Sequence, residues 1–283
     1  MYDVILENEY GDKLSFVDNP IFTITSIEGI NPPSATINTS EMAQIPGAKY
    51  NNSKTNVRQI LIKFSINLNP QENRLKIYKV IKSEKYIKFY TKRGNKDISI
   101  EGYVQSVDIG YFSLKQDVSI SILCPYPYFN ETQEVINNLD VVVPNFHFPF
   151  AITKEDPIPI SYIDTTSSAV INNKGDIEYG LKIEISARGN VTNPKIFNYI
   201  TGEFIGIKYN LLPGDLITIT TGVGQKEVTL LRENKEINIF NYLLKGITWL
   251  SVRGGENIFV CESEEGIRNM STKITHQNLY EGV

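Results

Sequence analysis

The stretch Arg58-Gln59-Ile60-Leu61-Ile62-Lys63-Phe64-Ser65-Ile66-Asn67 decides the fold class of the first half of this chain. Every second residue from Ile60 to Ile66 is a large apolar one, and a period of two is typical of a strand with one buried face. Turn signals frame the region on both sides. Upstream, Ile27-Glu28-Gly29-Ile30-Asn31-Pro32-Pro33 combines a glycine that permits a turn with a stiff proline pair. Downstream, a strand ending at Leu123-Cys124 cannot continue through Pro125-Tyr126-Pro127-Tyr128-Phe129.

Length and composition indicate two aromatic-rich β domains. The chain has 283 residues, of which 41% are hydrophobic and 21% charged, and this length suffices for two separate cores. No apolar run approaches the ~18 residues that span a bilayer, so we expect no membrane segment. No basic segment precedes an apolar one at the N-terminus, so we expect no signal peptide and synthesis in the cytoplasm. The two cysteines, Cys124 and Cys261, lie in separate halves and are interpreted as buried thiols rather than a disulfide.

The first half is predicted to be a β domain with one helix, over residues 1–130. Further strands are expected at 3–7, 13–17, 22–30, 85–91, 97–107 and 117–124, with a hairpin tip at Arg93-Gly94-Asn95. A helix is expected from Pro70, with Leu75, Tyr78 and Ile81 beside Ile77 and Val80 on its apolar face. Residues 31–57 are polar and weakly periodic, and a connection of that length is usually functional or an arm.

Residues 131–160 are predicted to form the interdomain connection, and residues 161–283 a second β domain. The connection carries four prolines and the cluster Phe146-His147-Phe148-Pro149-Phe150. In the second domain Leu181, Ile183 and Ile185, and likewise Ile217 and Ile219, alternate with polar residues, and turn signals recur at the short intervals of a sandwich. We expect residues 266–283 to be a docked or frayed end.

We find no catalytic, cofactor or metal site in the sequence and expect no enzyme. The only histidines, His147 and His276, stand outside any zinc or triad spacing. Gly222-Val223-Gly224-Gln225-Lys226 lacks the spacer and ending of a phosphate-binding loop and is interpreted as a hairpin turn. The net charge of −4 comes from 28 basic and 32 acidic residues without a basic block, which argues against tight binding to nucleic acid.

For two sets of side chains the sequence allows two interpretations each. Trp249 could form an aromatic platform for a sugar ring, with Arg253 beside it and Tyr242 near it in the sequence, or it could fill the interior of the second domain. Arg58 either anchors the polar arm, through a carboxylate or backbone carbonyls, or begins its strand in solvent.

Several of these segments together resemble the distal tail protein family of phages. In the first half they are "IEGINPP" (27–33), "GAKY" (47–50), "RQILIKF" (58–64), "EGYVQSVD" (101–108) and "ILCPYPYF" (122–129). In the second half they are "NNKGDIEYGLKIEISARGNVTNPKIFNYITGEFI" (172–205), "LLPGDLITITT" (211–221) and "WLSVRGGENIF" (249–259). Each piece is a weak signal, whereas their order and spacing make the resemblance specific.

The resemblance implies a fold and a place in the virion. It implies a mainly β chain, with a tail-tube-like β-sandwich carrying one helix followed by a galectin-like β-sandwich. Such proteins form a homohexameric ring at the tail tip of a siphophage, between the tail tube protein and a tail-tip hub or tail-associated lysin. A receptor-binding protein can dock on the second domain, and DNA passes through the lumen without specific binding. The sequence leaves open whether the source is a phage, a prophage or a phage-tail-like particle.

The alternative from another functional class is a carbohydrate-binding module. In that case the second domain would contact host cell-wall sugar through Trp249, Arg253 and Tyr242. The galectin-like fold does not decide between the two, because one fold carries many functions. A sugar site would need a cluster of exposed aromatic side chains near Trp249.

Overall fold

The computed structural model describes residues 3–42, 46–111, 115–139, 141–144, 161–164 and 168–283. The chain divides into two compact units. The first comprises Met1–Gln133 together with Leu279–Val283, and the second comprises Glu134–Asn278. Each unit buries a hydrophobic core of its own. The mainly β fold class predicted from the sequence is confirmed, with a single α-helix in the described part of the chain.

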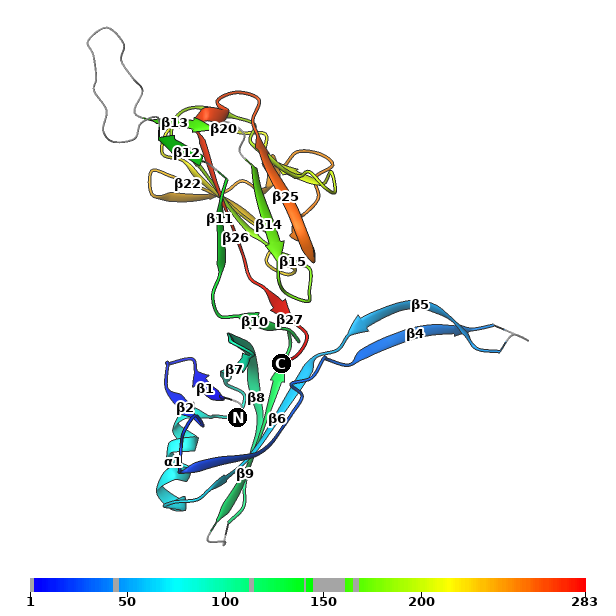
Figure 1. Cartoon of the computed structure of the whole chain (residues 1–283), viewed down its shortest axis with the longest axis vertical. Coiled ribbons are helices and arrows are strands. Elements are labelled where there is room, and N and C mark those ends of the chain that lie inside the picture. Colours follow the sequence, from blue (N-terminus) through cyan, green and yellow to red (C-terminus); the bar gives the residue numbers. More distant parts are fainter. Residues whose placement is uncertain (1–2, 43–45, 112–114, 140, 145–160, 165–167) are drawn as a thin grey trace. The chain divides into compact units, whose positions relative to one another are not determined.

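An antiparallel sheet organises the first unit (Figure 1). Its main path runs in the order β2, β1, β7, β8, β9, β6, β3; β10 pairs with β8, and β27 pairs with β10. The strands of the sheet are β1 (Ile5–Asn8), β2 (Lys13–Ser15), β3 (Phe22–Glu28), β6 (Arg58–Ile66), β7 (Tyr86–Arg93), β8 (Lys96–Ile109), β9 (Gln116–Cys124), β10 (Phe129–Glu131) and β27 (Leu279–Tyr280).

The central strand β6 has the alternation read from its sequence. Ile60, Ile62, Phe64 and Ile66 are all buried, and they pair with β9 from Arg58 opposite Cys124 to Ile66 opposite Gln116. The predicted hairpin tip at Gly94 is confirmed, because Arg93 pairs with Lys96 across a two-residue turn. Both observations follow from local rules: a period of two buries one face of a strand, and a glycine with positive φ closes a tight hairpin.

The predicted helix is α1 (Pro70–Val80), with Pro70 in its first turn, but its buried face differs from the prediction. Leu75 and Tyr78 are exposed, whereas Asn73 and Ile77 are buried together with Val80 and Ile81. Asn73 can be buried on this face although it is polar, because its side-chain amide donates a hydrogen bond to the Leu68 carbonyl at 2.6 Å. A buried polar group is normally hydrogen-bonded in this way. The expected apolar face that included Leu75 and Tyr78 was therefore wrong.

The described residues of the segment 31–57 include two paired strands, so the segment is an arm, one of the two interpretations that its length suggested. Strands β4 (Ala35–Glu41) and β5 (Ala48–Thr55) pair antiparallel as a separate two-stranded sheet, and Figure 1 shows them extending from the sheet of the first unit. Every residue of β4 is exposed, as are all of β5 except Thr55, which is half-buried. The hairpin is called the arm from here on.

The second unit contains a six-stranded sheet, a four-stranded sheet and smaller pairs. The six-stranded sheet runs in the order β11 (Val135–Asn138), β26 (Met270–His276), β16 (Lys182–Ala187), β21 (Leu216–Thr220), β22 (Glu227–Arg232), β23 (Lys235–Asn238). The four-stranded sheet runs β14 (Ser168–Asn173), β25 (Gly255–Glu262), β18 (Lys195–Asn198), β19 (Phe204–Gly206). The pairs are β12 (Val141–Pro144) with β13 (Ser161–Asp164), β15 (Tyr179–Gly180) with β24 (Ser251–Val252), and β17 (Val191–Thr192) with β20 (Asn210–Leu211). Two short 3₁₀ turns complete the unit, η1 (Phe240–Tyr242) and η2 (Ile267–Asn269).

The core of this unit is built from the alternating residues of its strands. Ile183 and Ile185 on β16 and Ile217 and Ile219 on β21 are buried, as their period predicts. Cys124 and Cys261 are buried in the cores of different units and are not joined by a disulfide. No helix in the described residues is long and apolar enough to cross a membrane.

The two units begin and end at other residues than the predicted domains. Residues 135–138 add β11 to the six-stranded sheet, because they pair with β26. Leu279 and Tyr280 return to the first unit as β27, which pairs with β10. The aromatic cluster at 146–150, within the predicted connection, lies outside the described residues.

Candidate functional site

The root of the arm is held by the guanidinium of Arg58, the first residue of β6. Arg58 is 3% exposed and donates four hydrogen bonds, all to backbone carbonyls. Its Nη1 donates to Gly29 and Asn31 at 2.5 and 2.6 Å, its Nε to Pro127 at 2.6 Å, and its Nη2 to Glu281 at 2.5 Å. Of the two sequence interpretations, the structure therefore supports the anchor, made through carbonyls. The planar fork of arginine is the one cationic side chain that can serve four such acceptors.

These bonds join three distant segments at one point: the start of the arm, the turn before β10, and the segment that follows β27. The Arg58 guanidinium also lies 4.7 Å from the centre of the Phe129 ring. Burial lowers the pKa of Arg58, and burial raises the pKa of the neighbouring Cys124 thiol to about 12. Arginine nevertheless remains charged in proteins, and Cys124 stays a neutral thiol at physiological pH.

Gly29 explains why the sequence turns at this point. Its φ is +85°, and an added Cβ would lie 1.9 Å from the Gln59 carbonyl oxygen. Only glycine fits such a contact. The main chain of the segment after β27 adds a further bond, from the Val283 amide to the Ile30 carbonyl at 3.1 Å. The arm thus leaves the sheet from a fixed root.

The two faces of the arm differ in chemistry. On one face Asn38 donates to Asn52 at 2.6 Å and Asn51 to Ser40 at 2.6 Å, so amides and hydroxyls pair across the strands. On the other face Ile37 and Tyr50 are 63% and 59% exposed, and the Tyr50 hydroxyl lies 3.0 Å from Ser53 Oγ. The remaining residues of this face are Ala35, Thr39, Glu41, Ala48 and Thr55.

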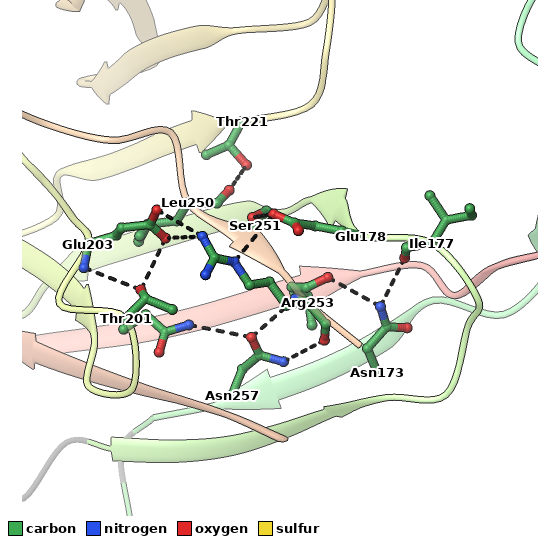
Figure 2. Close-up of polar contacts among 12 residues, drawn as sticks. Asn173, Ile177, Glu178, Thr201, Glu203, Thr221, Leu250, Ser251, Arg253 and Asn257 are labelled. Atoms are coloured by element: carbon green, nitrogen blue, oxygen red, sulfur yellow. Dashed lines mark hydrogen bonds and ion pairs between the residues drawn. The ribbon is translucent and has the colours of Figure 1, made fainter. Parts of the chain in front are cut away.

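The candidate sugar-contacting residues lie in the second unit, and each has protein partners. Figure 2 shows Arg253 directed toward Glu203, whose carboxylate accepts from Arg253 Nη2 at 2.9 and 3.1 Å. The Nε atom of Arg253 is 3.6 Å from the carboxylate of Glu178, which also accepts a hydrogen bond from the Ser251 hydroxyl. The Arg253 backbone is fixed through Asn257, which donates to the Arg253 carbonyl at 2.8 Å. Arg253 is therefore held in an ion-pair network at the surface.

Trp249 and Tyr242 make separate aromatic contacts. The Trp249 ring is half-buried against the core, lies 5.7 Å from the Phe240 ring, and has the Lys226 ammonium 5.2 Å from its centre. Tyr242 packs edge-on against Tyr209 at 5.0 Å. The contacts that occupy Arg253, Trp249 and Tyr242 involve different neighbours, and sugar binding through these three residues remains a prediction.

An ion pair between a buried carboxylate and a partly exposed arginine, which the sequence analysis did not identify, lies in the β21–β22 region. Asp215 is buried and accepts from Arg232 Nε at 2.8 Å and from Arg232 Nη2 at 2.5 Å. The hydrogen bond from Arg232 holds the pKa of Asp215 below its usual value. The turn signal Pro213-Gly214-Asp215 marked the position but not the partner, which lies 17 residues further along the chain.

The comparisons with known proteins point to phage tails. Residues 174–280 match the family model described as the siphovirus-type tail component, C-terminal domain. The fold of the chain is similar to that of the Dit protein (gp 19.1) of phage SPP1, described as a paradigm of hub adsorption apparatus in phages infecting Gram-positive bacteria. That alignment has a TM-score of 0.70 and 12% sequence identity, and it covers 99% of both chains.

A second similar structure is a chain of the phage P2 baseplate in its activated conformation with Ca. It aligns with a TM-score of 0.51 and 13% identity over 100% of both chains. No curated protein matches the sequence. The resemblance to distal tail proteins is confirmed by the family match for residues 174–280, and the fold is shared with SPP1 Dit along nearly the whole chain.

Proposed function

We propose that this protein is a structural subunit of a siphophage tail tip, where it forms a homohexameric ring that joins the tail tube to the host-adsorption apparatus. The likeness of the fold to SPP1 Dit and the family match support this role. The observation that carries the proposal within this chain is the arm, an exposed hairpin with a fixed root and with Ile37 and Tyr50 exposed on one face.

The arm is suited to contact a second copy of the chain. An isolated two-stranded hairpin is marginally stable in water, so one that is kept exposed in the single chain gains stability by docking. An arm that leaves one part of a subunit and docks on another part of the next makes a heterologous contact. Such contacts generate a ring when the rotation between neighbours closes.

The proposed ring has partners on both sides. One side would meet the tail tube protein and the other a tail-tip hub or tail-associated lysin, and the second unit would offer a site for a receptor-binding protein. A lumen would pass DNA without binding it specifically, which agrees with the net charge of −4. The place of action is the virion tail tip, after synthesis in the cytoplasm of the bacterial host.

The test compares two double variants of the full chain. In the first, Ile37→Ser and Tyr50→Ser remove the two large apolar side chains that this face of the arm exposes. In the second, Lys49→Ser and Lys54→Ser alter exposed residues on its other face. Negative-stain imaging of the unaltered protein and of the lysine variant should show rings with a central hole, and the Ile37/Tyr50 variant should show separate subunits. Rings that persist in the Ile37/Tyr50 variant would refute the role of the arm.

A further inference from the structure

A polar groove crosses the second unit between the ends of β16, β21 and β26 and the turn after β21. It consists of two adjacent hollows that share Thr220 and Gln225 in their walls. The inner hollow measures about 210 Å³ and the outer one about 570 Å³. Drug-sized ligands occupy pockets of ~300–1,000 Å³, so the inner hollow fits a single ring-sized group. We call the two hollows together the Gly222 groove.

Gly222 forms a cradle in the inner hollow. A Cβ added there would lie 3.3 Å from the Tyr179 hydroxyl oxygen and 3.5 Å from Gln225 Oε1, so these two polar atoms converge over the missing side chain. The backbone at Gly222 packs closely against Gly180, because a Cβ added at Gly180 would lie 2.4 Å from the Gly222 nitrogen. Thr221 adds to this support by donating to the Leu250 carbonyl at 2.6 Å. The cradle therefore sits on a backbone that is held in place.

The lining of the groove is polar on both its walls. Thr220 and Gln225 provide a hydroxyl and an amide at the junction, and Thr275 and Asn238 provide the same groups in the inner and outer hollow. These groups both donate and accept hydrogen bonds. A polar wall of this kind suits a ligand that is covered with hydroxyl groups.

Charges in the groove are balanced in sign. The inner hollow has Glu134 and Lys182 in its wall, and the outer hollow has Glu227 and Lys226. Equal numbers of carboxylates and ammonium groups give no net attraction for an anion or a cation. An aromatic ring stands in each hollow, Tyr179 in the inner one and Phe240 in the outer one. Aromatic rings offer an apolar face to the C–H side of a sugar.

We propose that the Gly222 groove binds a neutral oligosaccharide, with one sugar ring in the inner hollow and its neighbours in the outer one. The site lies at the junction of β16, β21 and β26 and does not depend on the ion-pair network of Arg253. It goes beyond the structural role proposed above, because a ring subunit needs no sugar.

The substitution Gly222→Ala tests the cradle. Gly222 has no positive φ, so alanine is compatible with its backbone, and the added methyl group meets only the ends of two side chains. Gly254→Ala is the matched control, because an added Cβ there meets nothing within 4 Å and the φ of Gly254 is not positive either. A second variant, Thr220→Val, keeps the shape of the wall and removes one hydroxyl.

The full-length protein and the three variants are applied to an array of bacterial-surface oligosaccharides that holds neutral capsule fragments, peptidoglycan fragments and teichoic acid fragments. The strongest hit is then titrated by calorimetry. We expect a neutral member to bind, with affinity lowered at least 10-fold by Gly222→Ala and measurably by Thr220→Val, and unchanged by Gly254→Ala. Three results would each overturn the proposal: no binding by the unaltered protein, binding of anionic members only, or an affinity of the Gly222→Ala variant equal to that of the unaltered protein.

The mass of the species that each variant forms in solution is measured in parallel by light scattering. Loss of sugar binding with intact rings concerns the groove alone, and loss of rings with intact sugar binding concerns the proposed structural role alone. The two proposals therefore fail separately.

Discussion

Replacement of Arg58 by alanine is the strongest test of how the arm is held. The substitution leaves four backbone carbonyls without their donor, in a place where the arginine side chain was 3% exposed. A hydrogen bond to a charged group contributes ~1.5–3 kcal/mol, and a buried acceptor left without a donor costs ~1–3 kcal/mol. These terms are not additive, because the four bonds share one side chain. We therefore expect Arg58→Ala to lower the free energy of unfolding of the first unit by about 4 kcal/mol, a little more than one such bond contributes.

The assay must report on the first unit. The single tryptophan, Trp249, lies in the second unit, so its fluorescence is unsuitable. Hydrogen exchange of peptides from β6 and β9 measures the opening of the first sheet directly. Arg58→Lys keeps the charge but not the planar fork and should lose about half as much stability.

Arg74→Ala is the control within the same unit. Arg74 lies on α1, half-exposed, with its guanidinium 5.0 Å from the Tyr111 ring. Its loss should change the free energy of unfolding by less than ~1 kcal/mol, as is usual for surface substitutions. If Arg58→Ala is no more costly than Arg74→Ala, the four carbonyl bonds do not stabilise the fold and the anchor is refuted.

Three further predictions concern acid stability, thiol reactivity and the arm. Because the hydrogen bond from Arg232 lowers the native pKa of Asp215, its contribution to stability is full above the unfolded value of ~3.9 and is lost as the pH falls through the native pKa. Asp215→Asn should thus lower the urea midpoint at pH 7, followed by tryptophan fluorescence, and the difference should shrink below pH 4; a constant difference would contradict this. Cys124, with a pKa of about 12, and the second buried thiol should not react with Ellman's reagent at pH 8 until guanidinium unfolds the protein, and rapid reaction of the native protein would contradict their burial. Trypsin should cut the free subunit after Lys49 or Lys54 and spare these bonds in rings, and equal cleavage in both forms would show that ring formation leaves the arm exposed.

Local rules predicted most strands of the first unit from the sequence, but few of those in the second unit. The alternation at Ile60–Ile66 and at Ile183 and Ile185 gave both the strands and their buried faces, because a period of two follows from the geometry of one strand. The helix at Pro70 was predicted by the same kind of rule. Its buried face was not, because Asn73 is buried through a hydrogen bond that depends on the path of the preceding turn.

Features that depend on distant partners could not be predicted. The pairing of β10 with β27 joins residues about 150 positions apart, and the four acceptors of Arg58 come from three separate segments. The strands of the arm could not be predicted from the polar sequence of 31–57. Both faces of the arm are exposed, so its sequence shows no alternation of apolar and polar residues. At the candidate sugar site, Arg253 is close to Trp249 in the sequence. The sequence could not show that Glu203 accepts a hydrogen bond from Arg253, or that Glu178 forms an ion pair with it.

The absolute mass of the full-length protein, measured by light scattering over a wide range of concentration and in a mixture with the tail tube protein, tests the central claim most directly. The account predicts a species of six times the 32.1 kDa of the chain, or a face-to-face pair of such rings. A mass of 32.1 kDa at every concentration, with the tube protein present as well as absent, would contradict the proposed ring.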